Sequence, residues 1–174
     1  MALSLNTTEN CKYLSVLINY TTTTTIILEL DILDFNGVSI AGNLTPTFTI
    51  NPGSQPISYP IAMSDLTVVY GLITVVLRTQ SGTKISSAAV LVHCDIDCCL
   101  TKLTNELVDC ACDCEKCNSS LAKAQKIFLL IKSADYALSL YDSSSTESLG
   151  YIQDAHNKYT KAREICDDSC GCNC

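Results

Sequence analysis

The stretch TIILELDILDF, residues 25–35, decides the structural class of the first half of this chain. Every second residue in it is apolar, namely Ile26, Leu28, Leu30 and Ile32. The positions between them include the charged residues Glu29 and Asp31. Successive side chains of a strand point to opposite faces, so this period of two predicts a β-strand with one buried face.

Four further segments have the composition of strands: CKYLSVLINY (11–20), LTPTFTI (44–50), LTVVYGLITVVLRT (66–79) and KISSAAVLVHC (84–94). The last two flank QSGT, a short turn that predicts a hairpin. Segment 66–79 is apolar on both faces, so both faces should be covered. Pro46 favours an edge position for segment 44–50.

The tract TTTTT (21–25) is either a turn or the β-branched start of a strand. We therefore expect an antiparallel β-sandwich-like domain over residues 1–94.

Charged residues are spread unevenly along the chain. The 174 residues include 11 Lys or Arg and 18 Asp or Glu, for a net charge of −7. Only eight of these charges lie before residue 94, and none lies between Asp34 and Asp65. Because interface centres are depleted in charge, we interpret segment 36–64 as a surface covered by neighbouring subunits of a homo-oligomer. Neutral loops around one short strand are the alternative.

The second half has the apolar spacing of helices. Apolar residues recur at three and four positions, which predicts helices at about 97–111, 119–142 and 147–166 with Ser119 or Ser120 as an N-cap. The stripe expected on the middle helix comprises Leu121, Ala124, Phe128, Ile131, Ala134, Leu138 and Tyr141. Short connections make consecutive helices antiparallel. The expected fold class is therefore α+β, with a Cys-rich antiparallel three-helix domain over residues 95–174.

Eight of the 12 cysteines form two tight groups about 50 residues apart. They are Cys110, Cys112, Cys114 and Cys117 in the first group, and Cys166, Cys170, Cys172 and Cys174 in the second. If the second helix runs away from residue 118 and the third returns, both groups meet at one end of the helical domain.

Three interpretations of these two groups are open. Disulfides would staple the C-terminus to the turn between the first two helices and would stabilise the fold by a few kcal/mol. Zinc is the second interpretation, because C-x-C-x-C-x2-C and C-x3-C-x-C-x-C supply thiolates for tetrahedral sites. Reduced thiols without a special role are the third. Disulfides are the first choice, with no cofactor, and zinc on the eight cysteines is the alternative.

A smaller group of cysteines lies where the two halves meet. His93, Cys94, Cys98 and Cys99 form an H-C-x3-C-C pattern that could ligate a metal, although packing at the end of a strand explains it equally well. Cys11 is alone in the sequence and could pair with Cys94 or one of its neighbours, tying the first strand to the last.

The sequence contains none of the motifs of common enzyme classes. G-x-S-x-G, H-E-x-x-H, G-x-G-x-x-G and a Gly-rich phosphate loop are all missing. His93 and Cys94 are adjacent on a predicted strand and point to opposite faces, which is poor geometry for a catalytic dyad. His156 is expected to be a solvated helix residue. We therefore expect no catalytic residues and no enzyme activity.

Charge and hydropathy bear on the partners and the location of the chain. Lys and Arg do not cluster, which argues against nucleic acid as a partner. No run of 18 apolar residues exists, so no membrane span is expected. The start MALSLNTTENC has neither the basic nor the apolar region of a secretory signal.

The order of parts resembles small virion proteins of tailed bacteriophages. The resemblance rests on LSLNTTENCKYLSV (3–16), CCLTKL (98–103) and KAQKIFLLIKSADYALSLYD (123–142). It implies a non-enzymatic head, neck or tail component, packed in many copies in a ring, tube or fibre and contacting other virion proteins. Its location would be the virion, assembled in the host cytoplasm. A subunit of a non-viral extracellular fibre or tubule is the alternative.

Overall fold

The computed structural model describes residues 2–7, 11–41, 46–53, 55–109, 114–142, 145 and 148–170. Within these ranges, side chains are described except at 2–7, 108–109, 114–116 and 169–170. The chain divides into two compact units. The β unit comprises Met1–Val92 and Asp142–Thr146, and the helical unit comprises His93–Tyr141 and Glu147–Cys174. The fold is α+β, as predicted.

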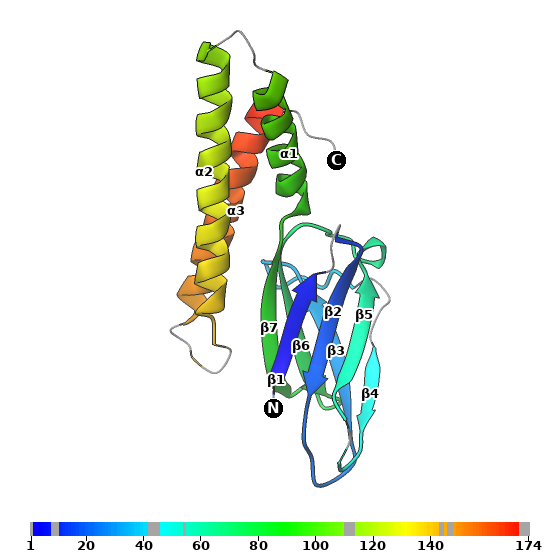
Figure 1. Cartoon of the computed structure of the whole chain (residues 1–174). Coiled ribbons are helices and arrows are strands. Elements are labelled where there is room, and N and C mark those ends of the chain that lie inside the picture. The colour runs from blue at the N-terminus through cyan, green and yellow to red at the C-terminus, as the bar shows by residue number, and fades with distance from the viewer. Residues whose placement is uncertain are drawn as a thin grey trace. The chain divides into compact units, whose positions relative to one another are not determined.

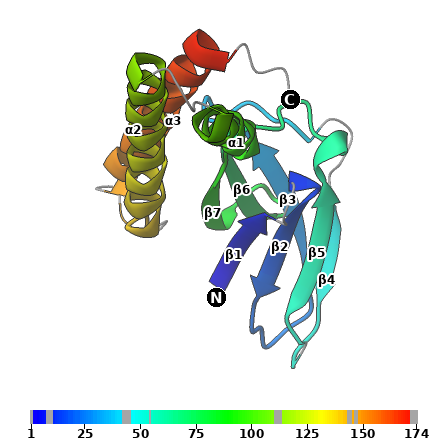
Figure 2. The ribbon, with the colours of Figure 1, turned by 45° about the horizontal axis from the view of Figure 1, so that its top comes forward.

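The β unit consists of two antiparallel sheets (Figures 1 and 2). The first has the order β1-β2-β5, with β1 at Ala2–Thr7, β2 at Tyr13–Asn19 and β5 at Ile57–Ala62. The second has the order β4-β3-β6-β7, with β4 at Thr47–Ile50, β3 at Ile26–Leu33, β6 at Gly71–Thr79 and β7 at Lys84–Val92.

One hydrophobic core holds both sheets together. Alternate residues of β2 and β3 are buried, as the period of two predicts. They belong to a single cluster of buried strand residues: Leu14, Val16, Ile18, Leu28, Leu30, Ile32, Ile50, Ile61, Ile73, Val75, Leu77 and Val92. Four buried residues outside the strands complete it: Ile40, Ala41, Met63 and Leu66. A shared core between two sheets is consistent with the predicted sandwich.

Two strands were not predicted, and one begins later than expected. The strands β1 and β5 are additional, and β5 lies inside the uncharged segment 36–64. The strand β6 begins at Gly71, whose φ of 98° suits glycine, rather than at residue 66. Residues are buried on both faces of β6, as expected. The threonine tract lies before β3, where the Thr22 hydroxyl donates to the Thr24 carbonyl, so it is a connection rather than a strand.

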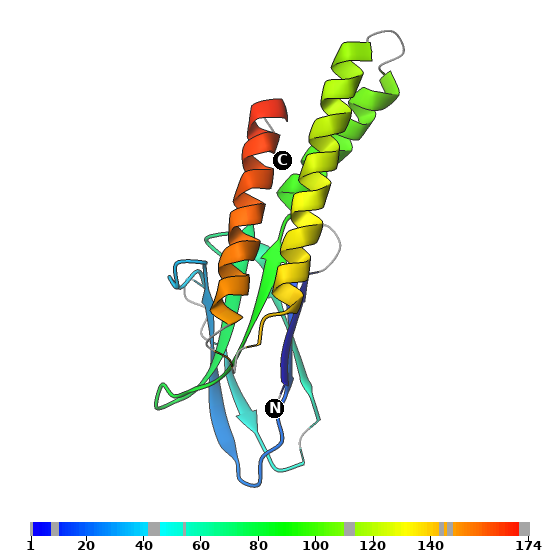
Figure 3. The ribbon, with the colours of Figure 1, turned by 90° about the vertical axis from the view of Figure 1, so that its left-hand side faces the viewer.

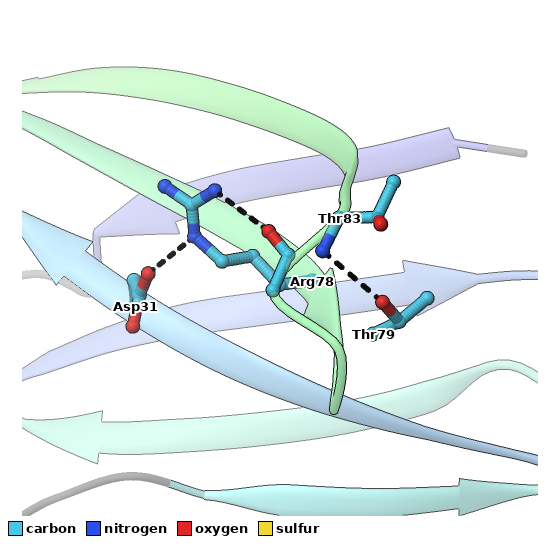
Figure 4. A network of polar contacts seen from close by, with 5 residues as sticks. Asp31, Arg78, Thr79 and Thr83 are labelled. Atoms are coloured by element: carbon cyan, nitrogen blue, oxygen red, sulfur yellow. Dashed lines mark hydrogen bonds and ion pairs between the residues drawn. The ribbon is translucent and has the colours of Figure 1, made fainter.

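The hairpin of β6 and β7 is tied to β3 by polar contacts (Figure 4). Arg78 Nε donates to Oδ2 of Asp31 at 2.6 Å, and Arg78 Nη1 donates to the Gly82 carbonyl at 3.3 Å. The Thr83 amide donates to the Thr79 hydroxyl at 3.1 Å, which closes the turn. About one-third of each side chain of this ion pair is exposed, so solvent screens the pair and its contribution to stability is small.

The helical unit contains α1 at Cys94–Asp109, α2 at Cys114–Ser139 and α3 at Leu149–Cys170. Consecutive helices are antiparallel, as predicted, and α2 packs along α3 (Figures 1 and 3). The predicted N-cap is wrong, because Ser119 and Ser120 lie inside α2. Ser120 is buried instead, and its hydroxyl lies 3.5 Å from Oε2 of Glu106 on α1.

The apolar stripe expected on α2 is wrong in part. Ile131 and Ala134 are buried as expected, together with Ile127 and Ala137, but Leu121 and Phe128 are exposed. On α3, the buried residues Ala155, Tyr159, Ala162 and Cys166 recur at three and four positions, the spacing that predicted this helix. No helix among the described residues is both long and apolar enough to cross a lipid bilayer.

Candidate functional site

The two cysteine groups were predicted to meet at one end of the helical unit. The start of α2 and the end of α3 lie toward the same end (Figure 3), which agrees with that expectation for the backbone. Cys117 is disulfide-bonded, and Cys166 is buried. Cys110, Cys112, Cys172 and Cys174 lie outside the described residues, as do the side chains of Cys114 and Cys170. Their pairing therefore stays a prediction.

The smaller cysteine group is also partly oxidised. Cys11, Cys94 and Cys98 are disulfide-bonded, and Cys99 is fully buried. A sulfur in a disulfide is no longer a thiolate and cannot ligate a metal in that state. Within the described part of the chain, no group of three His, Cys, Asp or Glu residues is placed to hold a metal ion. In this oxidised form Cys94 and Cys98 are therefore not available as thiolate ligands.

A polar cluster joins the first turn of α1 to the middle of α3. The Tyr159 hydroxyl donates to Oδ2 of Asp95 at 2.9 Å, and Arg163 Nε lies 3.8 Å from the same oxygen. Burial raises the pKa of Tyr159 well above its usual range, and the negative charge of Asp95 adds to the effect. The phenol therefore stays protonated and acts as a donor, which suits a structural contact.

A second contact joins His93, the residue before α1, to Asp97 on α1 and Asp135 on α2. Nδ1 of His93 lies 3.2 Å from Oδ2 of Asp97, and its Nε2 lies 3.9 Å from Oδ1 of Asp135. On α3, burial lowers the pKa of His156, so this side chain is less solvated than the sequence suggested. We assign no catalytic role to either histidine.

Two exposed surfaces carry apolar side chains. On the outer face of β2, Tyr13 is 47% exposed and Leu17 is 41% exposed. On α2, Leu129 is 65% exposed and Tyr136 is 66% exposed. The first surface agrees with the interpretation of the β half as an interface. The second was not predicted, because Leu129 and Tyr136 lie outside the stripe expected on the middle helix.

Comparison of the chain with protein-family models and with curated proteins found no match.

Proposed function

We propose that this chain is a non-enzymatic structural protein that assembles in many copies through the outer face of its β1-β2-β5 sheet. In this proposal it is a virion component of a tailed bacteriophage, a subunit of a ring, tube or fibre. The helical unit, locked by disulfides, is a second contacting element.

The observation that carries the proposal is the uncharged and partly apolar face of this sheet. Tyr13 and Leu17 are exposed on β2, and their partners in register on β5 are Ala62 and Ser58. None of the three strands of the sheet contains a charged residue. A free surface normally carries charges, whereas the centre of an interface is depleted in them. A second copy of the same neutral face is therefore a suitable occupant.

At the β5 edge of this sheet, the sequence favours contact through the face of the sheet rather than addition of a further strand. The edge strand β5 contains Pro60, and Pro56 immediately precedes it. Proline on an edge strand discourages pairing with a further strand. Assembly through the face leaves the strand order of each subunit unchanged.

Two other observations support the virion context. The resemblance of the sequence to phage virion proteins implies a multi-copy component. The disulfides at Cys11, Cys94, Cys98 and Cys117 suit a particle that is assembled in a cell and then released into an oxidising environment.

The test is the mass of the full oxidised chain in solution, measured by size-exclusion chromatography with light scattering over a range of concentrations. We expect multimers for the unmodified chain and a shift toward monomer for Leu17→Asp, because a buried unpaired charge opposes association. Ser64→Asp, at an exposed position outside the sheet, adds the same charge and should leave the mass unchanged. A monomer at the highest concentration, or equal masses for all three proteins, would refute the proposal. Electron microscopy of the multimer then distinguishes rings, tubes and fibres.

A further inference from the structure

The helix α2 has two apolar faces, and only one of them is used within the helical unit. Ile127 and Ala134 are buried on the inner face. Leu129 lies two residues after Ile127, and Tyr136 lies two residues after Ala134, a step of about 200° around a helix. Both Leu129 and Tyr136 are strongly exposed. The exposed stripe comprises Leu121, Phe128, Leu129, Tyr136 and Leu140. A helix that is apolar on opposite faces normally buries both, so the outer face indicates a contact.

A groove of about 470 Å³ lies beside this stripe, between α2 and α3. Its wall on α2 comprises Ala122, Gln125, Lys126, Leu129, Leu130 and Ser133, and α3 contributes Lys158. Leucine and alanine side chains provide an apolar floor, and the two lysines are its charged groups. Lys158 Nζ donates to Oδ2 of Asp154 at 2.6 Å, so Lys126 is the lysine of the groove without that neutralising contact.

The charge of α2 differs from that of the rest of the chain. Between Cys117 and Ser139 it carries three lysines, at 123, 126 and 132, and one acidic residue, Asp135, whereas the whole chain has a net charge of −7. Lys132 Nζ lies 5.7 Å from the centre of the Phe128 ring, which places a further positive charge over the exposed stripe. Lys126 in the groove and Lys132 over the exposed stripe place positive charge beside apolar side chains, which is complementary to an apolar surface that carries carboxylates.

We infer that this groove binds an amphipathic helix of a partner protein, with an apolar stripe toward Leu129 and Leu130 and with acidic residues toward Lys126. Helix-in-groove recognition uses apolar anchors at i, i+3, i+4 and i+7, and the exposed stripe on α2 offers contacts along several turns. A second copy of α2 is a poorer occupant, because it would bring lysines of the same surface together. This inference concerns a different surface from the sheet face and does not depend on self-assembly.

The experiment measures the binding of a defined probe to the full oxidised chain by fluorescence anisotropy. The probe is a labelled synthetic peptide of about five helical turns with leucines at i, i+3, i+4 and i+7 and glutamates at the other positions facing Lys126. A matched peptide carries lysine in place of every glutamate. We expect the acidic peptide to bind about tenfold or more tightly than the basic one, and its affinity to fall as salt is added.

Variants assign the binding to the groove. Leu129→Asp replaces an exposed side chain, so it should abolish binding without unfolding the chain, which circular dichroism checks. Lys126→Glu should reverse the preference between the two peptides, whereas Lys84→Glu makes the same charge change in the β unit and should have no effect. Absent binding, equal binding of both peptides, or an unchanged preference in Lys126→Glu would overturn the inference. So would dimerisation, or binding to vesicles of anionic lipid, that Leu129→Asp abolishes, because the occupant would then be a second copy or a membrane.

Discussion

The Tyr159 hydroxyl donates a hydrogen bond to Oδ2 of Asp95 over 2.9 Å, although the two residues are 64 positions apart in the chain. Tyr159 is buried on α3, and Asp95 lies in the first turn of α1. The contact therefore joins the first and last helices of the helical unit. Arg163, one turn beyond Tyr159, lies 3.8 Å from the same carboxylate oxygen and partly balances its charge.

Replacement of Tyr159 by phenylalanine should destabilise the helical unit. The ring stays in place, but Asp95 loses a donor in a partly buried site. A hydrogen bond to a charged group contributes about 1.5–3 kcal/mol, and we expect a loss in that range for Tyr159→Phe in urea unfolding followed by circular dichroism. Tyr151→Phe is the matched control on the same helix, where the side chain is exposed and the cost should stay below about 0.5 kcal/mol. Equal costs for the two variants would show that the contact with Asp95 contributes nothing.

The raised pKa of Tyr159 should make the folded chain less stable at alkaline pH. Burial and the charge of Asp95 raise the pKa of Tyr159 in the folded chain above its unfolded value of about 10. Below that pH the phenol is protonated in both states, so its contribution to stability is constant. Above it, the unfolded chain releases the proton while the folded chain retains it, and the free energy of unfolding falls as pH rises.

Urea unfolding between about pH 8 and pH 11 measures this dependence. The slope above pH 10 should be smaller in Tyr159→Phe than in the unmodified chain, since the variant lacks the titrating group. Recovery of the original signal on return to neutral pH checks that no covalent change has occurred. Identical slopes in the two proteins would mean that the Tyr159 phenol titrates alike in both states.

The β unit could be predicted where side chains alternate cleanly. In β3, Leu28, Leu30 and Ile32 are buried as the sequence indicates. The strand β5 was missed because ISYPIA contains a proline and follows the turn residues NPGSQP, both of which argue against a strand when read locally. It forms because β2 offers a partner from Tyr13 to Ile18, which is a tertiary contact.

The helical unit shows a different limit. On α3 one stripe is apolar, so the buried residues Ala155, Tyr159 and Ala162 could be predicted. On α2 apolar residues lie on opposite sides, and periodicity alone does not tell which side faces the other helices. The contact between Tyr159 and Asp95 depends on how α1 and α3 are offset along their axes. The spacing of apolar residues within either helix does not determine that offset, so the contact could not be predicted.

Reduction of the disulfides should lower the stability of the chain. Four of the described cysteines, Cys11, Cys94, Cys98 and Cys117, are disulfide-bonded. Removal of a native disulfide typically costs about 2–5 kcal/mol, largely because the unfolded chain gains freedom. We therefore expect a phosphine reductant to lower the melting temperature measured by circular dichroism. The denatured mass of the unreduced chain should be lower than its full-thiol mass by about two daltons per bridge.

A chelator provides the matched control, because it removes a metal but leaves a disulfide intact. Stability that falls with reductant and not with chelator would assign the cysteines to covalent cross-links. Stability that falls with chelator, in a chain whose denatured mass is that of the full thiol, would favour zinc on the clusters around Cys117 and Cys166 instead, since metal binding to thiolates is coupled to folding. A chain that is fully reduced and melts at an unchanged temperature would contradict the stabilising role of the cross-links, and the packing of α2 against α3 would then have to hold the helical unit together alone.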